Sequence, residues 1–342
     1  MRRYGSFLLR LILMSLLFWY LYKTLNWQDF AALVARSCGW WWLAAVGVYG
    51  IVTLLSILRW HILLVARHAK MRLERTAQLT MIGLFANTFL PGVMSGDVVK
   101  IFYATREIPH IKPTVVMSVV MERILGLVAM FLISTVLILV RYRALTSEPV
   151  TRYAVYFYFF VFGLILCAIA LGLWKGQRVL RHFKKKLPWQ ENLREAVQAY
   201  RFFLRHPLCF WGGLSLSAMA HFFLMFAFYF VSLALDMHLK FWDLAAVLPL
   251  VGLVTLIPST PNSLGVREIA FKHFLAFASM TQEASVALSL GGFFVILFWN
   301  LLGGLVYLQF HAQPAPAKIV IPESEANRES RGIDTGFPLS RE

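Results

Sequence analysis

Six apolar runs, each long enough to cross a lipid bilayer, constrain this chain more than any other feature. They lie near residues 7–25, 40–58, 114–140, 153–174, 208–235 and 284–309. A helix needs about 20 apolar residues to cross the hydrocarbon core, and backbone polar groups in lipid must bond within the protein. Five further runs follow the first, which lacks an Ala-x-Ala cleavage site, so we expect it to be a true span. The runs therefore predict an all-α polytopic membrane protein with six spanning helices.

Composition excludes several other classes of protein. The chain is 59% hydrophobic and 15% charged, whereas soluble domains carry about 25% charged residues. Its net charge of +16 comes from basic residues that cluster between the apolar runs. This pattern is typical of loops that face anionic lipid, so we expect no nucleic-acid partner. The three cysteines, Cys38, Cys167 and Cys209, are scattered and indicate neither a metal site nor a disulfide framework. We expect no metal and no cofactor, and the absence of a P-loop motif argues against ATP hydrolysis by this chain.

Two segments interrupt the apolar pattern with proline, glycine and small polar residues. Residues 87–97 read Asn-Thr-Phe-Leu-Pro-Gly-Val-Met-Ser-Gly-Asp, and residues 258–268 read Pro-Ser-Thr-Pro-Asn-Ser-Leu-Gly-Val-Arg-Glu. A broken helix is tolerated in a membrane where it lies within protein or lines a water-filled cavity. We therefore expect both segments to line a polar cavity. The predicted hinge residues are Pro91, Gly92, Gly96, Pro258, Pro261 and Gly265.

Loop charges favour a particular topology. If residues 77–95 enter and leave on one side as a re-entrant hairpin, the cytoplasmic loops hold nineteen Lys and Arg residues and the outer loops hold six. A full crossing by 77–95 would move the basic loop 175–207 outside and reverse this bias, against the positive-inside rule. Residues 242–282 then form a second re-entrant segment from the outer side. The order of spans and re-entrants repeats with opposite orientation, which predicts an inverted repeat.

Ionisable residues beside these breaks are candidates for a binding site, and each has a plainer alternative. Asp97 is suited to cap a helix N-terminus, whether or not it also contacts a substrate. Glu122 and Arg123 lie about eight residues into an apolar run, where charge is costly; they indicate either a cavity or an ion pair between helices. Arg267 and Glu268 start a returning half-helix, where Arg267 faces an anionic headgroup or Glu122, or reaches the outer interface. We expect these four charged residues, Glu122 to Glu268, to face one shared cavity, with Asn87 and Asp97 on its cytoplasmic side.

Uncharged residues support a plainer interpretation. Asn262, Ser263 and their neighbours in the second break are suited to bind headgroup oxygens, but more often such side chains satisfy the unwound backbone. Among the charged residues near the two breaks, Glu122 has Lys100 or Arg267 as a possible ion-pair partner. His221, alone on an apolar span, is more often packed or hydrogen-bonded than a metal ligand.

The same residues resemble the flippase-like membrane domain of the lysylphosphatidylglycerol synthase family, which also occurs without an aminoacyl-transferring domain. The resemblance covers about residues 5–310 and rests on Arg59-Trp60, on Asn87…Leu90-Pro91-Gly92…Gly96-Asp97, on Glu122-Arg123 and on Pro258…Leu264-Gly265-Val266-Arg267-Glu268. Two departures stand out, since Ser95-Gly96 replaces a frequent Gly-Gly and the late segment holds fewer glycines. These departures leave open a substrate other than an aminoacylated phospholipid. With the resemblance included, the expected substrate-binding residues are Arg59, Asn87, Ser95, Asp97, Lys100, Glu122, Arg123, Asn262, Ser263, Arg267 and Glu268.

The resemblance implies movement of a lipid between leaflets, and we expect a lipid transporter or flippase that is not an enzyme. Its substrate would be an anionic or lipid-linked molecule. One alternative is a membrane glycosyl or phosphoryl transferase, but the outer loops lack the paired acids that such enzymes use. A scaffold that recruits a partner through loop 175–207 is another alternative.

Domain boundaries and location follow from the same patterns. Residues 1–310 are expected to form the integral membrane domain of an inner cell membrane protein, with residues 311–342 as a disordered cytoplasmic tail. Both termini are expected in the cytoplasm. Residues 181–205 predict a basic amphipathic helix that binds anionic lipid of the inner leaflet.

Overall fold

Helices make up almost all of the part of the chain that the structure describes. The computed structural model describes residues 19, 22–23, 26–66, 69, 71–89, 95–108, 111–182, 206–255 and 263–310, and no strand occurs among them. The helices are α2 (Trp27–Ala35), α3 (Gly39–Val65), α4 (Leu73–Phe89), α5 (Ser95–Glu107), α6 (Lys112–Val140), α7 (Tyr142–Leu145), α8 (Pro149–His182), α10 (Pro207–Ala234), α11 (Phe241–Thr255), α12 (Val266–Phe274), the 3₁₀ helix η3 (Ala276–Ala278) and α13 (Gln282–Gln309). The prediction of an all-helical fold is confirmed for these residues.

Five of these helices are long and apolar enough to cross a membrane. They are α3, α6, residues 149–167 of α8, residues 209–234 of α10, and α13, which correspond to five of the six predicted spans. The remaining run, 7–25, lies almost entirely outside the described residues. Local sequence sets several helix starts. Pro207 opens α10, where its missing N–H is harmless, and the Thr281 hydroxyl caps α13 by accepting a hydrogen bond from the Ala284 amide at 3.2 Å.

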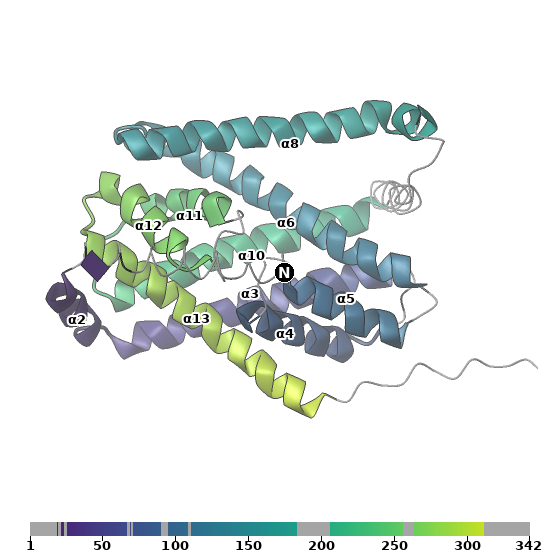
Figure 1. The fold of residues 1–342 in the computed structure, drawn as a ribbon, viewed down its shortest axis with the longest axis horizontal. Helices are drawn as coiled ribbons and strands as arrows, with labels where there is room; N and C mark the ends of the chain where they lie inside the picture. Colours follow the sequence, from purple (N-terminus) through teal and green to yellow (C-terminus); the bar gives the residue numbers. More distant parts are fainter. Residues whose placement is uncertain are drawn as a thin grey trace, which may run out of the picture.

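Four shorter helices form two hairpins. Helix α4 packs against α5, and α11 packs against α12. At 1.5 Å per residue their lengths run from about 26 Å for α4 to about 14 Å for α12, all short of the roughly 30 Å hydrocarbon core. In Figure 1 the α11–α12 hairpin lies toward one end of the bundle and the α4–α5 hairpin toward the other.

The α4–α5 hairpin is closed both along its length and at its base. A methyl group added at Gly96 would collide with the Gly83 carbonyl oxygen, so the two backbones touch where α4 and α5 cross. At the base, Arg75 at the start of α4 donates to the Glu107 carboxylate at the end of α5, with an Nε–Oε1 distance of 2.7 Å. The outer ends of α4 and α5 therefore lie together.

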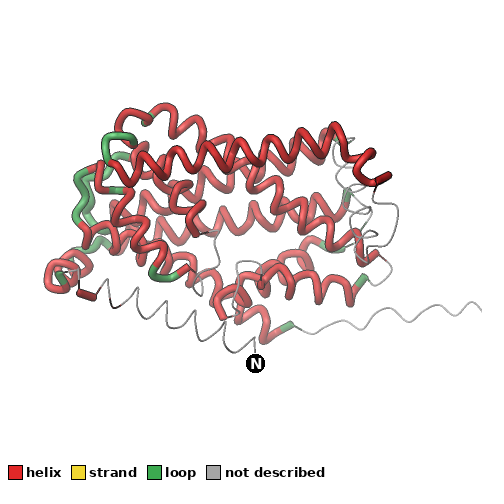
Figure 2. Tube along the Cα trace, turned by 45° about the horizontal axis from the view of Figure 1, so that its top comes forward, coloured by secondary structure: helices red, strands yellow, loops and turns green. Residues whose placement is uncertain are grey.

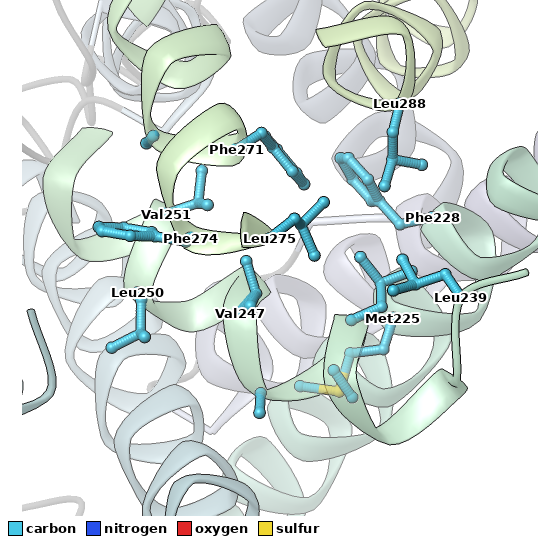
Figure 3. Packing of buried hydrophobic residues seen from close by; sticks show 14 of the residues in the cluster. Met225, Phe228, Leu239, Val247, Leu250, Val251, Phe271, Phe274, Leu275 and Leu288 are labelled. Carbon is cyan, nitrogen blue, oxygen red and sulfur yellow. The ribbon is translucent and has the colours of Figure 1, made fainter. Parts of the chain in front are cut away.

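The long helices α3 and α10 pack on each other through the middle of the bundle. Figure 2 shows helices throughout this bundle, with the described loops mainly at its ends. Each hairpin has its own apolar core. Trp60, Leu64 and Leu79 belong to the core beside α4 and α5. The larger core joins α10 and α13 to the α11–α12 hairpin, as the side chains of Phe228, Phe271 and Leu288 show in Figure 3.

Several predicted features lie outside the described residues. These are residues 90–94 and 256–262 of the two breaks, all but the first two residues of the amphipathic segment 181–205, and the tail 311–342. The predicted hinges Pro91, Gly92, Pro258 and Pro261 and the predicted site residue Asn262 are among them.

Candidate functional site

Five charged side chains form a network inside the bundle, which we call the charged cluster: Arg59, Asp97, Lys100, Glu122 and Arg123. Glu122 of α6 is 5% exposed and accepts from two cations. Its Oε1 lies 3.1 Å from Arg59 Nη2 and its Oε2 lies 2.6 Å from Lys100 Nζ. Since breaking a buried pair costs about 3–5 kcal/mol, the Glu122 carboxylate holds α3, α5 and α6 together.

Aromatic and hydroxyl groups complete the environment of these cations. Lys100 Nζ lies 4.0 Å from the centroid of the Trp60 ring, a favourable cation–π geometry. The Trp60 indole in turn donates to Ser118 Oγ at 3.0 Å. Arg59 Nη1 donates to Ser217 Oγ of α10, also at 3.0 Å. Both members of the Arg59-Trp60 pair thus belong to one network.

Arg123 and Asp97 form the exposed edge of the charged cluster. Arg123 Nε and Nη2 donate to the two Asp97 carboxylate oxygens at 2.6 and 2.7 Å, which is the strong bidentate arrangement. The Arg123 side chain is 43% exposed, whereas that of Asp97 is 11% exposed. Three cations and two carboxylates give the charged cluster a formal charge of one positive unit, so its accessible edge favours an anion.

Asn87 fixes the start of the helix that carries Asp97. Its Oδ1 accepts from the Gly96 amide at 2.7 Å and from Ser95 Oγ at 3.3 Å. These bonds satisfy a backbone donor at the N-terminus of α5, where no helical partner exists. Helix α5 begins at Ser95, so the expectation that Asp97 caps it is wrong. Asp97 lies in the first turn and binds Arg123 instead.

A second polar group lies at the start of α12. Gly265 adopts a φ of 86°, which an L side chain rarely takes, and its amide donates to Glu268 Oε2 at 2.6 Å. Glu268 Oε1 also accepts from Arg267 Nη2 at 2.8 Å and from Ser289 Oγ at 3.0 Å. Arg267 Nε donates to Ser289 Oγ at 3.0 Å. The fully buried Glu268 therefore fixes the position of the Arg267 guanidinium.

Arg267 borders a cavity of about 360 Å³, which we call the central cavity. Apolar side chains of α10, α11 and α12, such as Leu224, Val251 and Phe271, form part of its wall. Its polar lining residues are Tyr49, Asn87, Thr255, Ser263, Arg267 and Asn300. They come from helices α3, α4, α11, α12 and α13 and from the turn before α12. A largely apolar wall with a few convergent polar groups is the usual form of a small-ligand site.

The structure divides the predicted site residues into two groups. Arg59, Asp97, Lys100, Glu122 and Arg123 belong to the charged cluster, while Asn87, Ser263 and Arg267 line the central cavity. Ser95 bonds to Asn87 and Glu268 to Arg267.

Two sequence-based expectations need correction. Among Glu122, Arg123, Arg267 and Glu268, only Arg267 is a lining residue of the central cavity, so the four do not share it. Glu122 pairs with Lys100, which was one of its two expected partners. Arg267 pairs with its neighbour Glu268 instead of Glu122. The physical reason is proximity: α5 and α3 place two cations beside Glu122, and the turn at Gly265 folds Glu268 back toward Arg267.

Sequence reasoning missed several polar residues of both groups. Ser118, Ser217 and Ser289 bond to members of the two groups, and Asn300 lines the central cavity. Asn300 is an amide within an apolar run, and that position alone was a usable signal. His221 has the plainer role that was predicted, since its Nε2 lies 3.0 Å from the Gly126 carbonyl oxygen.

Comparison with models of known protein families identifies the family of this chain. The model of a family described as the lysylphosphatidylglycerol synthase TM region matches residues 7–304. The chain belongs to this family. No curated protein and no solved structure matches it.

Membership confirms the resemblance that the motifs indicated and gives the protein a membrane, lipid-related context. The structure shows what three of the family motifs do in this chain. Arg59-Trp60, Asp97 and Glu122-Arg123 meet in the charged cluster, although they are far apart in sequence. The fourth motif supplies Arg267 to the central cavity.

Proposed function

We propose that this protein moves an anionic lipid between the leaflets of a cell membrane and catalyses no covalent change. The observation that carries the proposal is the central cavity: a guanidinium and five other polar side chains border about 360 Å³ of space inside an apolar helical bundle. Polar groups at membrane depth are costly, and in membrane proteins they usually mark a substrate or ion pathway. A headgroup in this cavity would leave its acyl chains in the surrounding lipid.

The two hairpins support a re-entrant topology. Each of their helices is too short to span, and the Arg75–Glu107 pair brings the outer ends of α4 and α5 together. We infer that each hairpin enters and leaves on one side, and that the N- and C-termini are cytoplasmic. With residues 7–25 as a sixth span, the protein then has six spans and two re-entrant hairpins.

Packing between the two halves supports an inverted repeat. Helix α6 packs on α10, and α13 packs on α3; likewise α4 packs on α13, and α11 packs on α6. Exchanging α3 with α10, α6 with α13 and one hairpin with the other reproduces this pattern. In transporters built from such repeats, the substrate lies between broken helices near the bilayer middle, which is where the central cavity would be.

Arg123 and Arg267 have different roles in this proposal. Arg123 is the accessible guanidinium of a cluster with a net positive charge, so it would receive the lipid phosphate at the protein surface. Arg267 is 9% exposed and would hold the headgroup within the bundle. Arginine suits both tasks because its planar donors match phosphate oxygens.

The test uses purified protein in liposomes that contain phosphatidylglycerol with a fluorescent acyl chain. Dithionite bleaches only the label in the outer leaflet, so the bleached fraction reports redistribution, and mass spectrometry of the lipid reports any covalent product. We expect redistribution without new products. Arg123→Ala and Arg267→Ala should abolish it. Ser285→Ala should not, because among the described residues Ser285 Oγ bonds only to the Thr281 carbonyl of its own helix turn.

Two outcomes would contradict the proposal. Folded Arg123→Ala and Arg267→Ala proteins that redistribute lipid at the wild-type rate would show that these arginines are incidental. New lipid products without redistribution would favour the membrane transferase instead.

A further inference from the structure

We propose that Asn300 selects the headgroup: the central cavity takes an anionic lipid whose headgroup carries a free hydroxyl and no amine. The inference deepens the proposed function and rests on it only in taking a lipid as the occupant. It starts from two polar groups of the central cavity that have no hydrogen-bond partner among the described residues.

The first group is the carbonyl oxygen of the Asn300 side chain. Asn300 is 4% exposed and lines the central cavity. Its Nδ2 donates to Thr88 Oγ1 at 3.0 Å, whereas its Oδ1 is buried and has no hydrogen-bond partner in the part of the chain that the structure describes. A buried acceptor without a partner is costly, and most such groups in proteins are paired. An occupant that donates a hydrogen bond would remove this cost.

The second group is the outer edge of the Arg267 guanidinium. Its Nε and Nη2 are used by Ser289 and Glu268, and Nη1 has no hydrogen-bond partner among the described residues. The same guanidinium lies 5.0 Å from the centroid of the Phe293 ring, so its plane is held in place. Nη1 is therefore a fixed donor for an anionic oxygen such as that of a phosphate.

Together these groups require an occupant with an acceptor and a donor. A hydroxyl and an ammonium group both donate, but charge distinguishes them. None of the described residues that line the central cavity is acidic, and Glu268 is fully buried behind Arg267. An ammonium beside Arg267 would be desolvated next to a like charge with no carboxylate to receive it. A neutral hydroxyl meets the Asn300 carbonyl oxygen without that cost.

Three lipids with the same acyl chains and different headgroups test whether the cavity selects a hydroxyl, no donor or an ammonium group. Phosphatidylglycerol has a phosphate and hydroxyls, phosphatidylethanol has the same phosphate charge and no donor, and phosphatidylethanolamine has a phosphate and an ammonium group. We expect wild-type protein to move phosphatidylglycerol about tenfold faster than either of the others. Bound phosphatidylethanol would leave Asn300 Oδ1 unpaired, and bound phosphatidylethanolamine would place an ammonium group beside Arg267.

Two variants and one control test the role of Asn300. Asn300→Leu should lower the phosphatidylglycerol rate to that of phosphatidylethanol and erase the preference. Asn300→Asp adds a carboxylate to the cavity and should move the preference toward phosphatidylethanolamine. Ser285→Ala, on the same helix but absent from the cavity lining, should keep the wild-type order.

Native mass spectrometry of lipid binding to the same proteins separates this inference from the proposed function. Equal binding and equal movement of all three lipids would overturn the selection by Asn300 and leave the transport proposal intact. Selective binding of phosphatidylglycerol that Asn300→Leu removes, with no lipid moved by the wild-type protein, would support the inference and refute transport. Equal binding with no movement would refute both.

Discussion

Glu122 offers the most quantitative test of how the charged cluster stabilises the fold. Its carboxylate makes one charge-assisted hydrogen bond to Arg59 and one to Lys100, at 3.1 and 2.6 Å. Hydrogen bonds to charged groups contribute about 1.5–3 kcal/mol each. The Glu122→Gln variant keeps the shape of the side chain but leaves two buried cations without their carboxylate. We expect it to lower the free energy of unfolding by about 3–5 kcal/mol.

A second substitution separates charge imbalance from simple loss of contacts. The Lys100→Met variant leaves the Arg59–Glu122 pair in place, and we expect it to cost about 1.5–3 kcal/mol for the lost charged hydrogen bond. In the double variant one of the two cations left without a carboxylate is gone, so its cost should fall short of the sum of the single costs by about 2 kcal/mol. Strong coupling of this kind is the signature of an ion pair that is shielded from water.

The assay is unfolding of the purified protein in mixed micelles with increasing SDS, followed by circular dichroism. Ser285→Ala serves as the matched control, because it removes a buried hydroxyl whose described hydrogen bond goes to the backbone of its own helix turn. The reasoning would be refuted if the cost of the double variant equalled the sum of the two single-variant costs within about 0.5 kcal/mol. In that case the three charges would act independently and the network would have no energetic meaning.

Three further predictions concern the hairpins and the topology. Gly96→Ala and Gly303→Ala should each destabilise the protein by at least about 1–3 kcal/mol in the same SDS assay, since the added methyl groups would meet the carbonyl oxygens of Gly83 and Met81; Gly39→Ala, which meets nothing within 4 Å, should be close to neutral. Arg75→Ala should open the base of the α4–α5 hairpin and speed amide hydrogen exchange of Glu107 and its neighbours relative to α11, and unchanged exchange would show that Arg75–Glu107 does not hold the hairpin. Cysteines placed at Thr105 and Gln190 should react with a membrane-impermeant label only from the cytoplasm and one at Ser147 only from outside, whereas outside labelling at 105 would remove the re-entrant hairpin.

Much of the helical architecture could be predicted because hydropathy acts locally. A run such as 284–309 has to be helical in lipid, since only helices satisfy their own backbone there, and α13 ends at Gln309 as the run does. The prolines and glycines near 91 and 261 likewise indicated two breaks, and the structure has separate helices on either side of each. Helix boundaries were harder to predict than the helices themselves. Asp97 was expected to cap α5, but α5 starts at Ser95, where the side chain of Asn87 accepts a hydrogen bond from the Gly96 amide.

The pairing of charges could not be predicted in the same way. The sequence shows that Glu122 needs a partner, but which cation reaches it depends on how α3, α5 and α6 are placed in space. Arg59 lies sixty-three positions away and still bonds to it. The roles of Ser289 and Asn300 were missed for a related reason: the position of Asn300 in an apolar run marks it as unusual, but what either residue contacts depends on which side of α13 faces α4 or α12.

The glycine contacts of α4 determine which parts of the molecule can move separately. Gly83 allows α4 to lie close against α5. Gly303 and Gly304 allow α13 to lie close against Met81 and Phe85 of α4. Because these glycines have no side chains, the three helices pack closely as one unit, which we call the wedge, with little room to bend internally. Asn87 and Asn300 lie on this wedge, whereas Tyr49, Leu224 and Val251 lie on helices outside it. The proposed transport therefore predicts that the central cavity opens by a tilt of the whole wedge against α3, α10 and α11.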